Sequence, residues 1–241
     1  MRLTVLGRYG PCPAAGGATS GYFIESGQTR LLLDCGSGVV SNLLRLCPVT
    51  ALSGAVISHL HMDHASDLGV LRYALEAAGI RLPIVAPEAP ADAAALLLDH
   101  AAYLWELSAA GAVHRIGGLT VRLFPARHPV PTFAARISDG ARTLFYTGDS
   151  GDLPSLAEAA KGADVLLADA CFSNEDAAVK PPVHLSPAQA ARLARSAGAK
   201  RLLLTHVSGA AGAAAAMENV VAAGIDFTPA LVVQDMGAYE V

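Results

Sequence analysis

The side chains best suited to chemistry lie in one short segment, "SHLHMDH", at positions 58–64. Residues two apart on an extended chain point to the same side, so His59 and His61 can bind one ion together. Asp63 and His64 follow where the chain is expected to turn into a helix, and they point elsewhere. Because neutral imidazole and carboxylate groups suit Zn²⁺ and its first-row neighbours, the segment predicts metal binding through two pairs of ligands.

Three more residues of ligand type follow apolar runs elsewhere in the chain. His128 comes after "LTVRLFPAR", Asp149 after "RTLFYTG" and His206 after "RLLLT". In open α/β sheets the carboxyl ends of the strands form the edge where ligands bind, so we expect these side chains to meet there. Nothing connects His100 or His114 to this group, and we interpret both as capping or surface residues.

The elements that must position these residues alternate between strands and helices, as in an α/β protein. Strands are expected at 2–7, 21–26, 29–35, 53–58, 82–87, 118–128, 132–138, 142–149, 164–170 and 201–205. Helices are expected at 38–46, 64–79, 88–107, 153–163 and 187–197. The last helix has the clearest ends, because Ser186 can cap it, Pro187 fits its first position and Gly198 can stop it. Within the Gly/Pro-rich loop at 8–21, residues 16–20 either form a plain connection or approach the metals and the substrate.

The segments "SHLHMDH", "YTGD" and "LTHVS", with the isolated histidine after "FPAR", resemble the metallo-β-lactamase fold superfamily. The resemblance implies a four-layer αββα sandwich with a dinuclear metal site at one sheet edge. It implies that one metal is held by His59, His61 and His128, and the other by Asp63, His64 and His206, with Asp149 bridging the two.

Within that superfamily the chain is most similar to ribonuclease Z-like phosphodiesterases, through "LLLDCGSG", "FYTGDS" and the region 166–208. In ribonuclease Z a carboxylate and a histidine assist proton transfer, and Asp169 and His184 occupy those positions here. Asp169 stands where that family usually has Glu. The long tRNA-binding arm has no counterpart either, because a single hairpin fills the stretch between His128 and Asp149.

The resemblance and the ligand set together predict two-metal hydrolysis of a small phosphodiester by a metal-bridging hydroxide. Asp63 would orient the nucleophile, and His184, assisted by Asp169, would protonate the leaving oxygen. Zinc is the first choice of metal, with manganese or iron as alternatives. The rival functions are a thioesterase, lactonase or β-lactamase of the same fold (glyoxalase II-like enzymes share nearly the same ligands), a tRNA 3′-processing endonuclease, and a non-catalytic binding module.

Composition narrows the partners of the protein. A net charge of −4 and a pI near 6.0 argue against an extended nucleic-acid surface but allow a small anionic substrate. No apolar run reaches the ~18 residues of a membrane-spanning helix. The four scattered cysteines are typical of reduced thiols, so we expect a cytoplasmic protein. We also expect one domain over residues 1–241, and a homodimer by analogy with ribonuclease Z.

Overall fold

Side chains of the first strands alternate between two apolar layers. In the computed structural model, which describes residues 1–225, 227 and 229–241, Leu3 and Val5 face one layer and Leu6 faces another. Tyr22 and Phe23 divide in the same way. Because successive residues of a strand point to opposite faces, a strand that is apolar on both faces must be covered on both sides.

The strands form two mixed sheets, each of seven strands within the described residues. The first sheet has the order β14 (Ala238–Glu240), β1 (Arg2–Gly7), β2 (Gly21–Ser26), β3 (Thr29–Leu33), β4 (Gly54–Val56), β5 (Leu82–Ala86) and β6 (Tyr103–Leu107). The second has the order β13 (Ala230–Val232), β12 (Leu202–Thr205), β11 (Val165–Asp169), β10 (Thr143–Tyr146), β9 (Phe133–Ser138), β8 (Leu119–Pro125) and β7 (Val113–Ile116).

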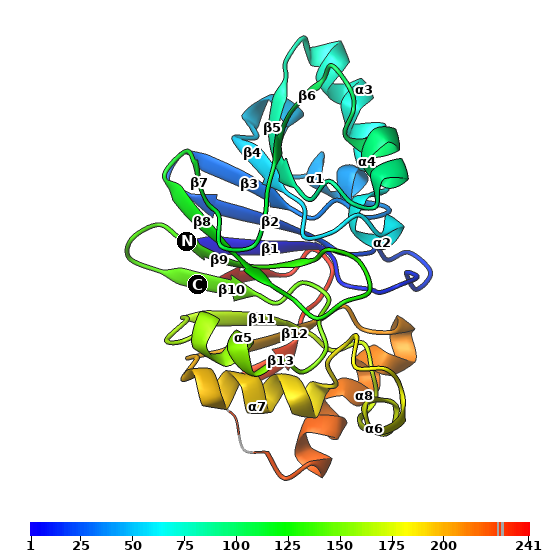
Figure 1. Cartoon of the computed structure of the whole chain (residues 1–241), viewed down its shortest axis with the longest axis vertical. Helices are drawn as coiled ribbons and strands as arrows, with labels where there is room; N and C mark the ends of the chain where they lie inside the picture. Colours follow the sequence, from blue (N-terminus) through cyan, green and yellow to red (C-terminus); the bar gives the residue numbers. More distant parts are fainter. Residues whose placement is uncertain (226, 228) are drawn as a thin grey trace.

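The helices cover the outer faces of the two sheets, as Figure 1 shows. The first sheet is covered by α1 (Val39–Leu43), α2 (Met62–Ala65), α3 (Leu68–Ala78) and α4 (Ala91–Leu97), with a short 3₁₀ turn at Val49–Ala51. The second is covered by α5 (Pro154–Ala159), α6 (Asn174–Val179), α7 (Pro187–Ala197) and α8 (Gly209–Ala222). Three apolar cores lie between the four layers: one between the sheets and one beneath each set of helices. The αββα sandwich expected from the resemblance is therefore confirmed.

Parallel pairing brings the functional segments to one edge. Strands β3 to β6 run parallel in the first sheet, and β10 to β13 run parallel in the second. Strand β8 points the same way as β10, because both pair antiparallel with β9. The segments that follow β4, β8, β10 and β12 therefore leave their sheets in compatible directions.

Two of the helix expectations were wrong. Residues 88–107 form the short helix α4 and then strand β6, because the Tyr103–Leu107 segment pairs with β5 and that pairing overrides the helical propensity of an Ala/Leu-rich stretch. Residues 64–79 form two helices, because the backbone around Asp67 bonds to Cys35 and interrupts the helical ladder. The caps at Ser186 and Gly198 are confirmed, with a complete capping box at Ser186.

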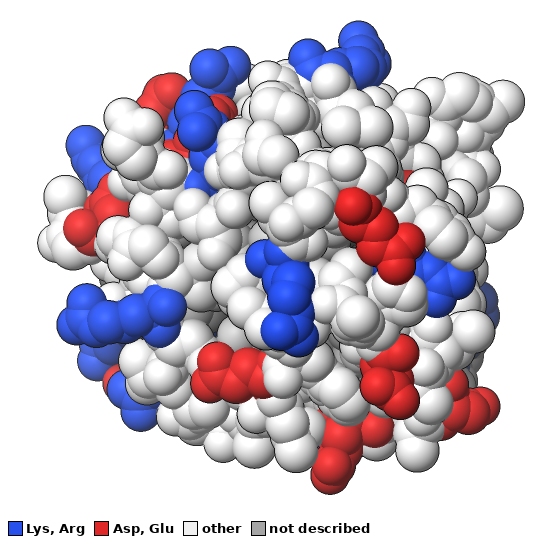
Figure 2. All heavy atoms as spheres, turned by 90° about the horizontal axis from the view of Figure 1, so that it is seen from above, with Lys and Arg blue, Asp and Glu red and all other residues white. Residues whose placement is uncertain are grey.

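Among the helices of the described chain, none combines the length and apolarity needed to cross a lipid bilayer. Seen from above in Figure 2, basic and acidic side chains form separate small groups on a largely uncharged face. The described residues on this face form no continuous basic patch.

Candidate metal centre

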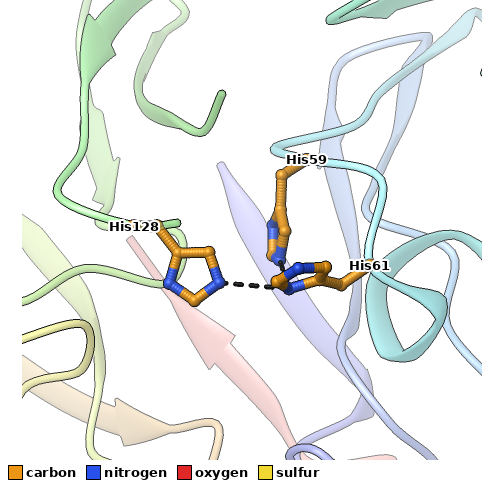
Figure 3. Close-up of side chains that lie close together, drawn as sticks. All are labelled: His59, His61 and His128. Atoms are coloured by element: carbon orange, nitrogen blue, oxygen red, sulfur yellow. Dashed lines mark hydrogen bonds between the residues drawn. The ribbon is translucent and has the colours of Figure 1, made fainter. Parts of the chain in front are cut away.

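Three imidazoles converge where the loop after β4 meets the loop after β8. Nδ1 of His61 lies 3.1 Å from Nε2 of His59 and 3.1 Å from Nε2 of His128, as drawn in Figure 3. A tetrahedral ion with bonds of about 2.0–2.1 Å separates its ligand atoms by about 3.3 Å. These three nitrogens are therefore spaced as the ligands of one ion would be.

A second group lies beside the first. Asp63 and His64 come from α2, Asp149 follows β10 and His206 follows β12, and one ligand atom of each lies within 4.8 Å of the others. His64 and His206 are fully buried, whereas the Asp63 side chain is partly open to solvent. The group offers two imidazoles and two carboxylates, a donor set that suits a first-row divalent metal.

The carboxylate of Asp149 lies between the two groups. Its Oδ2 is 3.7 Å from Nε2 of His59 and 3.9 Å from Nε2 of His128, in the first group. The same oxygen is 3.3 Å from Nε2 of His206, and Oδ1 is 3.1 Å from Nε2 of His64, in the second group. The structure thus brings together all seven expected ligand residues, with Asp149 between the two groups.

Burial and mutual repulsion keep most of these histidines neutral. Burial, followed by the neighbouring His64, lowers the pKa of both His59 and His206 well below its usual range. Burial also lowers the pKa of His128 to about 4 and raises the pKa of Asp149 to about 6. His64 is the exception, because Asp149 and Asp34 outweigh its burial and raise its pKa well above the usual value. Neutral imidazole is the form that binds a metal.

Several buried polar atoms of the centre lie near one another without a well-aligned hydrogen bond. Among the described residues, His64 Nε2, His206 Nε2 and Asp149 Oδ1 make no hydrogen bond although each is buried. A buried polar atom without a partner costs free energy, and native proteins rarely leave one unsatisfied. All three atoms face the interior of the second group, so a bound cation would satisfy them together.

Asp34 holds His64 on the side of the ring away from the second ligand group, a role that was not predicted from the sequence. It is fully buried after β3, and its Oδ2 lies 2.8 Å from Nδ1 of His64. It also accepts hydrogen bonds from the backbone N–H and hydroxyl of Ser58 and from the hydroxyl of Tyr146. The available signal was the one that pointed to Asp149, a carboxylate directly after an apolar strand.

Other ligands are also held through their second ring nitrogen. Ser20 Oγ lies 3.0 Å from Nδ1 of His206, and the carbonyl oxygen of Val183 lies 3.0 Å from Nδ1 of His128. Gly10 packs so closely on the His206 ring that a Cβ there would overlap it. The expected approach of residues 16–20 to the centre is therefore seen at Ser20, and contact with a substrate stays a prediction.

His184 and Asp169 form a pair at the margin of the centre. Nδ1 of His184 lies 2.9 Å from Oδ2 of Asp169, which also accepts from the backbone N–H groups of Ser150 and Leu185. Burial lowers the pKa of His184, but the charge and hydrogen bond of Asp169 together with the charge of Asp149 outweigh burial and raise that pKa to about 9. His184 also borders a cavity of about 450 Å³, so a protonated donor faces space that a ligand can enter.

Three other polar side chains lie outside the centre. Asp67 accepts a hydrogen bond from the backbone of Val40 at the start of α1, so it supports a helix. His100 pairs with Glu76. His114 is buried on β7, and its interpretation as a capping or surface residue was wrong, because strand alternation turns it inward.

Residues 29–207 match the family model of the β-lactamase superfamily domain. The probable metallo-hydrolase YhfI of Bacillus subtilis is 35% identical over 86% of this chain and 87% of its own length. Ribonuclease Z of Haloferax volcanii is 27% identical over 86% of this chain and 84% of its own.

Two solved structures extend the comparison. The crystal structure of YhfI from Bacillus subtilis superimposes with a TM-score of 0.90 at 30% identity, covering 99% of this chain and 98% of that one. The short form of human tRNase Z superimposes with a TM-score of 0.79 at 20% identity, covering 100% and 99% of the two chains. The second likeness is one of fold.

Proposed function

The chain belongs to the β-lactamase superfamily, in its metallo-β-lactamase fold, and from that premise we propose that it is a hydrolase that cleaves a small phosphodiester with two divalent metal ions. The position of Asp149 carries the proposal. Its two oxygens lie 3.1–3.9 Å from nitrogens of both ligand groups, as expected of a carboxylate shared by two ions.

The donor set favours zinc, with manganese or iron as alternatives, because imidazole and carboxylate accept all three. His59, His61 and His128 would hold one ion, and Asp63, His64 and His206 the other. Two such ions would supply Lewis acidity, which lowers the pKa of a shared water and offsets negative charge on the phosphate oxygens.

The chain's own residues would handle the protons. The Oδ2 atom of Asp63 lies 3.7–3.8 Å from Nε2 of His64 and His206, where it can orient the attacking water. His184 is protonated near neutral pH, so it can donate a proton to the leaving oxygen. Asp169 holds the Nδ1 side of that ring and leaves Nε2 for the substrate.

Three observations favour a small substrate. The hairpin of β9 and β10 connects the loop of His128 directly to Asp149, without room for an arm that grips tRNA. The cavity beside His184 has a volume of about 450 Å³, in the range of small-molecule sites. In the described lining, Lys180 is the one Lys or Arg side chain and is paired with Asp176, so the cavity does not present the several cations that a long polyanion would need.

The test compares two substrates on metal-loaded protein. We expect turnover of bis(p-nitrophenyl) phosphate with added Zn²⁺ or Mn²⁺, and little turnover of S-lactoylglutathione. The reverse preference would replace the phosphodiesterase with a thioesterase. Two bound metals without either activity would favour a binding protein.

Variants test the assigned roles. Asp149→Ala should lose metal and activity together, because it removes the shared carboxylate. His184→Ala should keep both metals and lose about 10²–10⁴-fold in rate, the usual contribution of a general acid. His100→Ala is the matched control, since that ring pairs with Glu76 and contacts none of the proposed ligand residues. Wild-type turnover by His184→Ala would remove His184 from the mechanism.

A further inference from the structure

A serine, a histidine and a glutamate meet outside the metal centre. The hydroxyl of Ser108 lies 2.7 Å from Nε2 of His114, and Nδ1 of the same ring lies 3.0 Å from a carboxylate oxygen of Glu106. Each partner therefore contacts the ring nitrogen that it contacts in a Ser–His–acid triad. The three residues are separate from the metal centre and share no residue with it.

These three residues lie where the chain passes from the first sheet to the second, and the backbone there holds them in place. Glu106 lies on β6, Ser108 directly follows it, and His114 lies on β7, the first strand of the second sheet. The backbone N–H of Ser108 donates to Ala86, and Gly111 turns the chain with a φ of 94°. Ser108 and His114 are 9% and 8% exposed, so their contact is shielded from water. The Glu106 side chain is largely in solvent. A carboxylate so exposed orients the ring but adds little charge stabilisation.

Ser108 also borders a cavity of about 270 Å³. Its other walls are mostly apolar and come from the segments after β5 and β6 and before β9: Pro87, Glu88, Ala89, Ala109, Ala110, Pro131 and Phe133. The segments after β5 and β6 lie at the carboxyl ends of parallel strands, where α/β proteins bind ligands. Within the described structure the backbone N–H groups of Ala109 and Ala110 have no acceptor, so they are free to donate to a ligand oxygen.

We propose that Ser108, His114 and Glu106 form a second, metal-independent nucleophilic site that cleaves small apolar carboxylic esters. The Ser108 oxygen bonds to the ester carbonyl carbon while its proton passes to Nε2 of His114. The carbon–oxygen bond of the ester then breaks, and the alcohol leaves with the proton from His114. Water, deprotonated by the same nitrogen, releases the carboxylic acid and restores Ser108.

Covalent labelling tests whether Ser108 is activated. The full-length protein is treated with diisopropyl fluorophosphate, and the modified peptide is identified by mass spectrometry. We expect one adduct, on Ser108, which is absent from Ser108→Ala and formed at least tenfold more slowly by His114→Gln. Ser155 is the internal control, because it borders another cavity without a histidine partner.

Turnover separates this site from the metal centre. In an Asp149→Ala background, p-nitrophenyl butyrate hydrolysis should fall about 10²–10⁴-fold with Ser108→Ala or His114→Gln, since each removes the nucleophile or its base. In the otherwise wild-type, metal-loaded protein, Ser108→Ala should leave phosphodiester turnover unchanged. Circular dichroism melting curves verify that each variant is folded.

The proposal is overturned if folded protein gives no adduct at Ser108, or if Ser155 reacts equally fast. It is also overturned if His114→Gln labels and hydrolyses at the wild-type rate. In each of these cases the contact between Ser108 and His114 only ties β6 to β7.

Discussion

The role of Asp34 can be tested by replacing its carboxylate with an amide of the same shape. Asp34 adopts a left-handed backbone with a φ of 57°, which Asn tolerates, so Asp34→Asn adds no backbone strain. One carboxylate oxygen lies 2.8 Å from Nδ1 of His64, and the other accepts the backbone N–H of Ser58 at 2.6 Å. An amide group can accept on only one of these two sides, so it must place its NH₂ against a donor.

Asp34→Asn should mainly weaken metal binding. If the NH₂ faces His64, the ring must move its proton to Nε2, the nitrogen that faces the second ligand group. Removing an outer partner of this kind usually costs 10–100-fold in metal affinity, or about 1.4–2.7 kcal/mol. If it faces Ser58, a buried donor is left unpaired, which lowers the free energy of unfolding by about 1–3 kcal/mol.

Competition with a chromophoric chelator measures the affinity, and thermal melting with and without EDTA measures the stability. Tyr146→Phe is the control, because it removes one donor to Asp34 at 2.8 Å but leaves the carboxylate on His64. We expect it to change metal affinity less than threefold (about 0.65 kcal/mol). The reasoning fails if Asp34→Asn binds metal as tightly as the wild type and melts at the same temperature.

Three further changes probe the scaffold. Gly10→Ala should lower metal content, measured by elemental analysis, because its Cβ overlaps the ring of His206; full occupancy would contradict this packing. Asp164→Asn should destabilise the protein at pH 7, because Lys200 lowers the pKa of Asp164. This contribution is present above the unfolded pKa of about 3.9 and is lost as the pH falls through the lower folded value. The difference between the two urea midpoints should therefore shrink between pH 5 and pH 3, and a constant difference would refute the charge explanation. Ser186→Ala should lower the free energy of unfolding in urea by about 1 kcal/mol by removing a capping box, and an unchanged midpoint would exclude that role.

Much of the centre could be predicted from the sequence, because its residues share a local pattern. His128, Asp149 and His206 each follow an apolar strand, and such strand ends converge in this class of fold. Their supporting residues share no such pattern. Ser20 contacts His206 only because a loop far away in the sequence folds back, and the Gly-rich stretch predicts an approach to the centre without identifying the residue or the ligand involved.

The fold was hardest to predict where composition and pairing disagree. The segment before β6 is rich in Ala and Leu, which favour a helix, but β5 offers an unpaired edge that takes the Tyr103–Leu107 segment as a strand. His114 was misplaced for a similar reason. Strand β7 is only four residues long, too short for its alternation to stand out in the sequence.

The metal centre draws its side chains from both halves of the chain, with Asp63 and His64 beside the first sheet and His128, Asp149 and His206 at the second. An ion bound by both halves would connect them in the native state, and the unfolded chain would not bind it. Free metal at 100 times its dissociation constant would add about 2.7 kcal/mol to the free energy of unfolding. In a cell starved of that metal, the same protein would open more often and be degraded sooner, so its abundance would follow the metal supply.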